Sequence, residues 1–448
     1  MLERLHLREV GPAPELEIDF AQRLNVLTGD NGLGKTFLLD LGWWALTRTW
    51  PDVDHQAWPR PGDATSTPSI AYSIRGAGKS SMFESKYSWK EQAWPQKGHR
   101  PPKPGMVVYM RVDGSFAVWD PARNYYREAP TVGVSAPDRL PAFFFDREQV
   151  WKGIGPIEKS VCEGLERDWL TWQSQKDAAF DDLCTALRRL SHDSGEILQP
   201  GKPMRMRLED RRDTPTLMLS YGLTPVPLAS AGIKRMLALA YLLVWAWREH
   251  KEATRITRQE PTDRIVLLLD EIEAHLHPRW QRALLPSVLD VVNALAAEVD
   301  VQLVVATHSP MVLASLETSF DESTDRLHHL VLDHTPKGHR ARVETIPWAK
   351  QGDVTNWLVS HIFGLKQARS IEAERAIEAA EALMRGAPDE APPKLRSAAS
   401  IDAELRRVLA GHDPFWPRWI IEHPELHPGP KQAKRKRSGA KKKGTSRA

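Results

Sequence analysis

The chain has 448 residues, of which 41% are hydrophobic and 27% charged, and its formal net charge is +3. These values suit a folded protein of two or three domains. No run of about 18 uncharged apolar residues could span a bilayer, and the charged N-terminus does not look like a secretory segment. Cys162 and Cys184 offer neither a disulfide framework nor paired zinc ligands. We therefore expect a cytoplasmic protein with no membrane partner.

The first 50 residues predict three strands, a glycine-rich loop and a helix. Gly11 and Pro12 mark a turn between the first two strands, and the third strand is apolar and leads directly into the loop. The predicted strands are residues 2–8, 15–20 and 24–28, and the helix is residues 35–47.

Two segments of different character follow. Residues 51–152 contain short alternating runs separated by Gly and Pro, including the apolar run 140–145, and this predicts an antiparallel β subdomain with long loops. Residues 153–202 have apolar positions at helical spacing without sustained heptads. They predict an inserted helical arm, either a helix pair or a single helix.

From residue 203 to 350, strand and helix patterns alternate. Such alternation predicts a mostly parallel sheet with helices on both faces, so residues 1–50 and 203–350 are expected to form one α/β core. The predicted strands are residues 204–208, 216–221, 265–269 and 301–306, the helices 231–249 and 278–297, and a hairpin 327–346.

The C-terminal part divides into a helical region, residues 351–430, and a basic tail, residues 431–448. The tail contains nine Lys or Arg and no acid. It is compatible with a nucleic-acid contact through phosphate neutralisation, and equally with a disordered, solubilising end. The predicted helices of the region before it are residues 355–363, 370–385 and 394–410.

The sequence GDNGLGKT matches the phosphate-loop pattern, in which two glycines separated by four residues precede Lys and a hydroxyl residue. Its glycines allow backbone N–H groups to converge on phosphates at a helix N-terminus. Lys35 is expected to reach the β- and γ-phosphates of ATP, and Thr36 to bind Mg²⁺. The expected nucleotide contacts are Gly29, Asn31, Gly32, Gly34, Lys35 and Thr36.

An acid pair follows the apolar strand IVLLL. Asp270 and Glu271 lie at its carboxyl end, the edge where open α/β sheets bind ligands. Asp270 suits the Mg²⁺ shell, and Glu271 suits a general base that polarises the attacking water. An apolar strand followed by two acids is commonly structural, but here it lies downstream of a phosphate loop.

One strand–helix unit later, the sequence VVATHSP places His308 after another strand. His308 is a candidate for a hydrogen bond to the γ-phosphate. A single histidine at such a place is usually a loop residue, and its position in the motif order favours the functional interpretation.

The sequence ASAGIKRM, from Ala229 to Met236, opens a helix with Ser230 and Gly232. It resembles the signature of ATP-binding cassette proteins, Leu-Ser-Gly-Gly-Gln, although Ala229 replaces Leu and Ala231 replaces the first Gly. In that family the Ser and Gly contact the γ-phosphate held by another protomer. The alternative is an ordinary Ser N-cap.

The four motifs occur in the order of that family, and the resemblance extends from Met1 to about Lys366. The forms DEIEAHLHP and ATHSP are similar to those of soluble recombination, overcoming-lysogenisation-defect and anti-phage ATPases. The resemblance implies a phosphate-loop ATP-binding cassette fold and a homodimer or higher oligomer that encloses two ATP molecules. It also implies that Glu273, His275 and His277 touch the second subunit; a metal site at the two histidines is the alternative.

These families also carry a glutamine between the β subdomain and the helical arm. Gln149, after the predicted strand 140–145, is the candidate and would contact the nucleotide and Mg²⁺. Surface glutamines in such sequences are common, and this one is equally compatible with having no such role.

Three functions are compatible with these motifs. Residues 357–370 resemble the ATPases of Septu-type defence pairs, which implies a sensor ATPase that acts with a separate nuclease. A RecF-like repair ATPase that binds DNA directly is the second, and an ATP-locked scaffold with slow hydrolysis is the third.

Overall fold

The computed structural model describes the chain except residues 52–55, 61–66, 77–78, 96–102, 125–139, 156–160, 192–195, 210, 297, 336–337 and 428–448. The predicted basic tail therefore lies outside the described residues. The chain forms two compact units, Met1–Phe363 and Gly364–Ala448. In the described part of the chain, none of the helices combines the length and apolar character needed to cross a bilayer.

The main sheet of the first unit has eight strands, and four of its seven pairings are parallel. The predicted mostly parallel α/β sheet is thus confirmed. The antiparallel strands lie at its two edges. In spatial order the strands are β15 (Gly338–Ile346), β14 (Asp325–Thr335), β3 (Leu24–Gly29), β13 (Asp300–Ala306), β12 (Arg264–Asp270), β6 (Met106–Met110), β7 (Phe116–Trp119) and β8 (Phe143–Phe145).

Strand β12 shows why its sequence is a continuous apolar run. Val266 and Leu268 pack into the core on one face of the sheet, whereas Leu267 and Leu269 pack into the core on the other. Successive strand residues point to opposite faces, so a strand covered on both sides has no polar alternation.

Strand β6 differs from the predicted division of the chain. Residues 51–152 were expected to form a β subdomain, but β6 pairs in parallel with β12 in the main sheet, and β7 and β8 extend that sheet. All five residues of β6 are buried. The uninterrupted apolar run MVVYM is typical of a strand covered on both faces.

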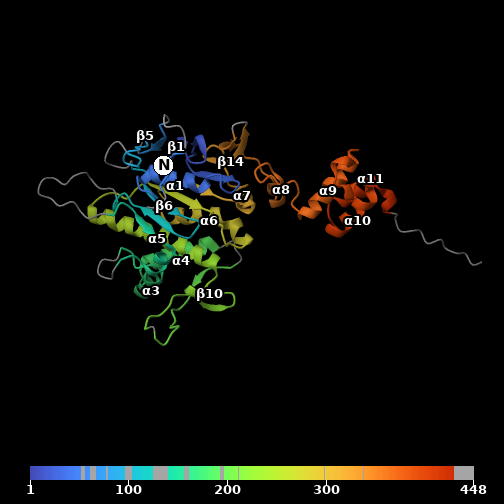
Figure 1. Cartoon of the computed structure of the whole chain (residues 1–448). Helices are drawn as coiled ribbons and strands as arrows, with labels where there is room; N and C mark the ends of the chain where they lie inside the picture. The colour runs from blue at the N-terminus through green and yellow to red at the C-terminus, as the bar shows by residue number, and fades with distance from the viewer. Residues whose placement is uncertain are drawn as a thin grey trace, which may run out of the picture. The chain divides into compact units, whose positions relative to one another are not determined.

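A second, antiparallel sheet contains β2 (Ala13–Asp19), β1 (Leu2–Val10), β4 (Ser69–Arg75) and β5 (Ser80–Lys86). It therefore combines strands expected in the core with strands expected in the subdomain. Helix α1 (Lys35–Thr47) lies between the two sheets (Figure 1), and its Trp43 and Trp44 belong to the core that both sheets share.

The other face of the main sheet is covered by helices (Figure 1). The segment expected to be an arm is a helix pair packed into this core, where Trp169 and Trp172 are buried. The hydroxyl of Tyr241, which lies in α5 (Ala231–Thr257), donates a hydrogen bond to Asp168 of the helix pair over 2.6 Å and so holds the pair against α5. Besides α1, the α-helices of this unit are α2 (Arg147–Lys152), α3 (Leu165–Gln175), α4 (Ala178–Ser191), α5 (Ala231–Thr257), α6 (Pro278–Leu295), α7 (Pro310–Ser315) and α8 (Val354–Val359).

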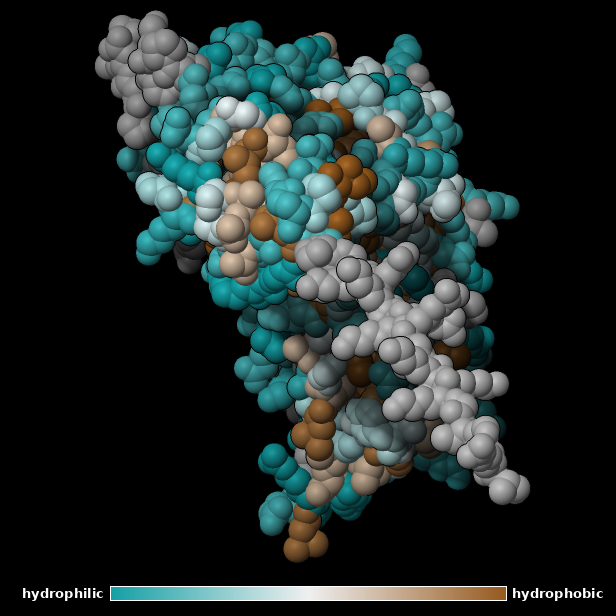
Figure 2. Space-filling model, turned by 90° about the vertical axis from the view of Figure 1, so that its right-hand side faces the viewer, coloured by the Kyte–Doolittle hydropathy of each residue, from teal (hydrophilic) through white to brown (hydrophobic). Residues whose placement is uncertain are grey.

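A small three-stranded sheet precedes α5. It contains β11 (Gly222–Pro225), β10 (Thr216–Leu219) and β9 (Gln199–Pro200), followed by the short 3-10 helix η2 (Val226–Leu228). The strand predicted at 204–208 is absent, because that segment makes only an isolated bridge from Met204 to Thr214. Leu208 and Tyr221 are exposed there, and Figure 2 shows apolar side chains in brown at the lower end of the molecule, where β10 lies in Figure 1.

The second unit has its own apolar core, which includes Ile377, Leu405 and Trp419. The indole of Trp419 donates to Asp402 over 3.0 Å. The predicted region 351–430 is thus divided, since α8 belongs to the first unit. The elements of the second unit are α9 (Ile371–Met384), α10 (Ala398–Val408), α11 (Trp416–Glu422) and the 3-10 helices η3 (Pro388–Glu390), η4 (Pro393–Leu395) and η5 (Pro424–Leu426).

Candidate nucleotide-binding site

Strand register gathers three motifs at one edge of the main sheet. Asp270 at the end of β12 pairs with Ala306 at the end of β13, and Ala306 pairs with Leu27 of β3. The parallel strands β3, β12 and β13 therefore end side by side. The phosphate loop, the acid pair and the turn with His308 follow these three ends.

The phosphate loop has the backbone that its glycines predict. Gly29, Gly32 and Gly34 have φ of 133°, 78° and 101°, a region that residues with a Cβ rarely adopt. A Cβ on Gly29 would also lie 2.3 Å from the carbonyl oxygen of Leu330. The loop therefore reaches α1 through backbone conformations that glycine adopts readily.

Lys35 lies within this loop. Its ammonium group donates to the carbonyls of Gly29 over 2.8 Å and Asp30 over 2.9 Å. Burial lowers the pKa of Lys35, and the negative charges of Glu271 and Asp270 oppose that shift. This cation is placed beside the acid pair, where it can bind phosphate oxygens.

Thr36 and Asp270 form the expected cation-binding pair. The Thr36 hydroxyl donates to Asp270 Oδ2 over 2.9 Å, while the buried Oδ1 has no partner among the described residues. Burial raises the pKa of Asp270 to about 6, despite this hydrogen bond. An orphaned carboxylate oxygen beside a hydroxyl suits Mg²⁺, which prefers hard oxygen ligands.

Glu271 and His308 face each other next to this pair. The Glu271 backbone has φ of 45°, and His308 Nε2 lies 3.1 Å from Glu271 Oε1. Both side chains are about one-third exposed. Burial and the charge of Lys35 lower the pKa of His308, against the effect of Glu271. The pair is thus accessible to a water molecule and to a phosphate.

Glu273 has a different place from the one expected. It was assigned to a segment that touches a second subunit, but its side chain is buried in its own chain. Glu273 Oε1 accepts hydrogen bonds from the Thr307 hydroxyl and from the His308 N–H. The tight turn after β12 directs this carboxylate inward, where it holds the turn that carries His308. His275 and His277 remain exposed.

Ser230 and Gly232 form the signature turn, residues 230–232, at the start of α5. Ser230 is the N-cap and its hydroxyl oxygen accepts from the N–H of Ile233 over 3.4 Å. A Cβ on Gly232 would lie 2.9 Å from the His275 carbonyl oxygen, so the turn after the acid pair packs directly on this glycine.

The signature turn opens onto a hollow of about 640 Å³. No residue of the phosphate loop, 29–36, is among those that line it. The hollow at the signature turn is therefore separate from the phosphate loop of the same chain. The lining residues are Glu196, Ser220, Tyr221, Ser230, Gly232, Ile233, His275, Leu276, His277, Arg279 and Trp280.

Arg235 was not among the expected site residues. It is 8% exposed, and its guanidinium donates to the carbonyls of Val112 over 2.8 Å, Glu271 over 3.1 Å and Asp270 over 3.2 Å. A buried guanidinium thus connects the signature helix to the backbone of the acid pair. The signal in the sequence was a charge at the start of the otherwise apolar run MLALAYLLVW.

Gln149 lies at the start of α2, after β8. Its side chain accepts the Asp146 N–H over 2.9 Å in a capping box. Two strands, β7 and β6, separate β8 from β12. The side chain of Gln149 thus caps its own helix, and the structure does not bring it into contact with Thr36 or Asp270.

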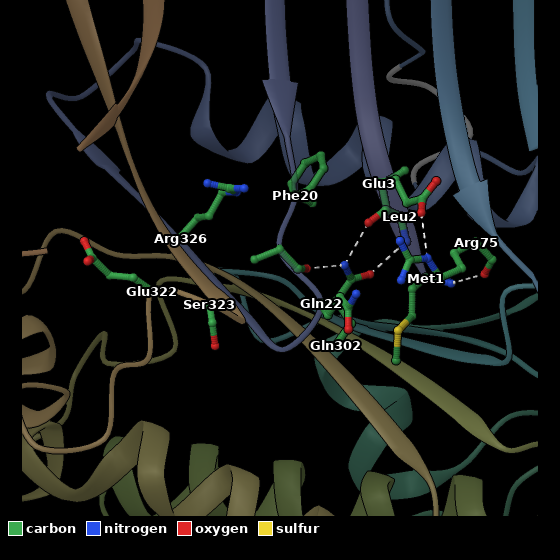
Figure 3. A pocket seen from close by; sticks show the side chains of 11 residues that line it. Met1, Leu2, Glu3, Phe20, Gln22, Arg75, Gln302, Glu322, Ser323 and Arg326 are labelled. Carbon is green, nitrogen blue, oxygen red and sulfur yellow. Dashed lines mark hydrogen bonds and ion pairs between the residues drawn. The ribbon is translucent and has the colours of Figure 1, made fainter. Parts of the chain in front are cut away.

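A smaller hollow of about 230 Å³ lies at the opposite ends of the strands (Figure 3). There the Gln302 amide donates to the carbonyls of Leu2 and Ala21, each over 2.8 Å. The Met1 ammonium donates to the Arg75 carbonyl over 3.0 Å, and burial lowers the pKa of this amine to about 5. These hydrogen bonds hold β1 against the main sheet, so the groups at this hollow have a structural role. The candidate nucleotide site is therefore the edge of the sheet with the phosphate loop.

Comparison with known proteins agrees with a nucleotide site. Residues 206–314 match a family model described as "AAA domain, putative AbiEii toxin, Type IV TA system". This segment contains the signature turn, the acid pair and His308.

Several solved structures are also similar. The SMC head domain from Thermotoga maritima is 14% identical, with a TM-score of 0.37 over 78% of this chain and 99% of that one. An SmcHead bound to the C-winged helix domain of ScpA is 13% identical, with a TM-score of 0.40 over 77% and 98% of the two chains. An Smc head derived from Pyrococcus furiosus, with an extended coiled coil and bound to the C-terminal domain of ScpA, is 12% identical, with a TM-score of 0.35 over 77% and 96%.

The chain has an α/β fold and the motif order of a phosphate-loop ATPase, and its residues 206–314 are similar to the AAA domain model.

Proposed function

We propose that this protein hydrolyses ATP at a composite site between two copies of itself. The observation that carries the proposal is the separation of the two motifs within one chain. The phosphate loop lies beside the acid pair, whereas the signature turn opens onto a hollow that no phosphate-loop residue lines. In a head-to-tail dimer, each signature turn would cap the phosphates held by the other copy.

Each residue at the sheet edge then has a defined role. The backbone of residues 29–34 and the Lys35 ammonium would bind the phosphates, and Thr36 and Asp270 would hold Mg²⁺, which would neutralise phosphate charge. Glu271 orients the attacking water and accepts its proton. His308, 3.1 Å from Glu271, can donate a hydrogen bond to a γ-phosphate oxygen. Catalysis is positioning and charge neutralisation.

ATP binding would close the dimer, and hydrolysis would reopen it. ATP joins the two copies because its γ-phosphate contacts both, and loss of that phosphate removes the shared contact. Within one chain, Arg235 would couple the position of the signature helix to that of the acid pair, since its guanidinium donates hydrogen bonds to the carbonyls of Asp270 and Glu271.

We assign this switch to a regulatory ATPase of an anti-phage system that acts with a separate nuclease. The family description matched by residues 206–314 names a putative toxin of a toxin–antitoxin system. The described part of the second unit is a helical bundle with an apolar core. Among the described residues we recognise one chemical site, and we infer that a regulated effector would be a different protein.

A specific observation favours direct DNA binding as the second candidate. Lys202, Arg205, Arg207 and Arg211 are all exposed in the segment before β10. Clustered cations bind phosphate backbones, with an affinity that falls as salt rises. ATP-dependent, salt-sensitive binding of duplex DNA without any nuclease partner would favour this candidate.

Two substitutions test the composite site. Glu271→Gln should abolish turnover and trap an ATP-bound dimer, measured by phosphate release and by light scattering after size exclusion. Ser230→Arg should bind ATP but neither dimerise nor hydrolyse it, because the larger side chain would occupy the place in the hollow where the phosphate of the second copy is expected. Turnover in either variant, or a native protein that hydrolyses ATP as a monomer, would contradict the proposal.

A further inference from the structure

Arg279 lies in the same hollow as Ser230. It is the second residue of α6 and is exposed. Among the described residues, no hydrogen bond or ion pair engages its guanidinium. A cation that faces a hollow without a carboxylate partner is available to an anionic ligand.

The surroundings of Arg279 also favour an anion. The hollow is lined by the N-caps of two long helices, Ser230 of α5 and His277 of α6. Helix N-termini carry partial positive charge, and here the N-caps of two helices line the same hollow as Arg279. Glu196 is the only carboxylate among the described residues that line the hollow, whose volume is about 640 Å³.

The source of that anion follows from Ser230. If the composite site exists, the phosphate that reaches Ser230 belongs to ATP on a second copy, and it enters the hollow that Arg279 lines. This inference rests on the proposed function. It adds a residue that the signature resemblance does not supply.

We propose that Arg279 is a catalytic residue supplied in trans, which binds the γ-phosphate of ATP held by the second copy. Hydrolysis forms a bond from the water oxygen to the γ-phosphorus and breaks the bond to the β–γ bridging oxygen. Glu271 of the copy that holds the ATP takes the proton, and ADP leaves. Arg279 transfers no proton; its guanidinium neutralises charge on the phosphoryl oxygens in the transition state.

Homodimers of the variant give the first readout. Arg279→Ala should lower kcat by roughly 10³-fold, since arginine fingers contribute 10³- to 10⁵-fold. Arg282→Ala is the matched control, because Arg282 is exposed on the same helix, one turn further, and is not among the lining residues of the hollow. It should hydrolyse ATP like the native protein. Equal turnover of Arg279→Ala and the native chain would overturn the proposal.

Mixed dimers separate a trans contact from a structural effect. Co-expressed Glu271→Gln and Arg279→Ala chains, purified through two different tags, contain one complete site, in which the first chain supplies Arg279 to ATP on the second. In a single turnover, about half of the bound ATP should be hydrolysed, because one of the two equivalent sites is intact and the other keeps its ATP. A contact within one chain would leave both sites inactive.

The outcomes distinguish this inference from the proposed function. If Glu271→Gln forms an ATP-bound dimer but the mixed dimer stays inactive, the role of Arg279 is wrong and the composite site stands. If Glu271→Gln remains monomeric with ATP, the composite site itself fails, and the inference fails with it.

Discussion

The buried carboxylate of Asp270 lowers the stability of the nucleotide-free chain but suits the binding of a metal ion. Its carboxylate is 1% exposed, one oxygen lacks a partner among the described residues, and burial raises its pKa to about 6. An ionised group in this position destabilises the nucleotide-free chain. The same features make it a strong ligand for a divalent cation, which removes the charge conflict when it binds.

Asp270→Asn should therefore stabilise the nucleotide-free protein while it abolishes Mg²⁺-dependent turnover. The folded pKa of about 6 lies above the unfolded value, so the cost of ionisation is absent below about pH 4 and complete above pH 6. Two pKa units correspond to about 3 kcal/mol at most. Denaturant unfolding at pH 7.5 and pH 4 measures the gain, which should appear only at the higher pH.

Asp263→Asn is the control for this effect, because the Asp263 side chain is 70% exposed in an ion pair with Arg264. Its unfolding free energy should change little at either pH. A gain for Asp270→Asn that is the same at both pH values would show that burial of charge is not the cause.

At the scale of elements, α5 joins the signature turn to the acid pair through Arg235. Glu271 holds a left-handed backbone, which costs about 1–3 kcal/mol for a residue with a Cβ and persists only where neighbours hold it. The guanidinium bonds to the carbonyls of Asp270 and Glu271, and so provides that support.

Arg235→Met should lower both stability and turnover. Loss of hydrogen bonds from a charged group should reduce the unfolding free energy by about 1–3 kcal/mol. We expect kcat to fall at least about tenfold, equivalent to about 1.4 kcal/mol in the barrier. ATP affinity should change less, because Arg235 does not contact the phosphate loop in the described structure.

Arg255→Met is the comparison on the same helix, since Arg255 is exposed and pairs with Glu252 one turn away. It should preserve both kcat and stability. Normal turnover by Arg235→Met would mean that the backbone at Glu271 does not depend on α5.

At the scale of the whole molecule, the two units have separate cores. A chain that ends at Phe363 should fold and bind ATP with unchanged affinity, because every residue of the nucleotide site lies in the first unit. Calorimetric titration with ATP measures this.

The residue at which the chain is truncated should affect its stability, because α8 belongs to the first unit. The Trp357 indole donates to Glu317 over 2.7 Å, and Trp357 is buried. A chain that ends at Gly352 loses this anchor and should unfold at a lower temperature. Failure of the longer chain, 1–363, to bind ATP would show that the second unit contributes to the site.

The sequence by itself determined the features that depend on contiguous residues. GDNGLGKT specifies its loop because three glycines supply the backbone angles and Lys35 follows within the same segment. The strand before Asp270 was recognisable because five apolar residues in succession require burial on both faces. The α/β sheet and the motif order follow from such local patterns.

Tertiary structure alone decided the features that depend on distant pairing. Strand β6 joins β12 rather than a subdomain, and Arg235 reaches a carbonyl 123 residues away at Val112. Glu273 turns inward to Thr307, 34 positions along the chain. Periodicity records which side chains are buried, but not which surface buries them, and that choice is made by the packing of the whole chain.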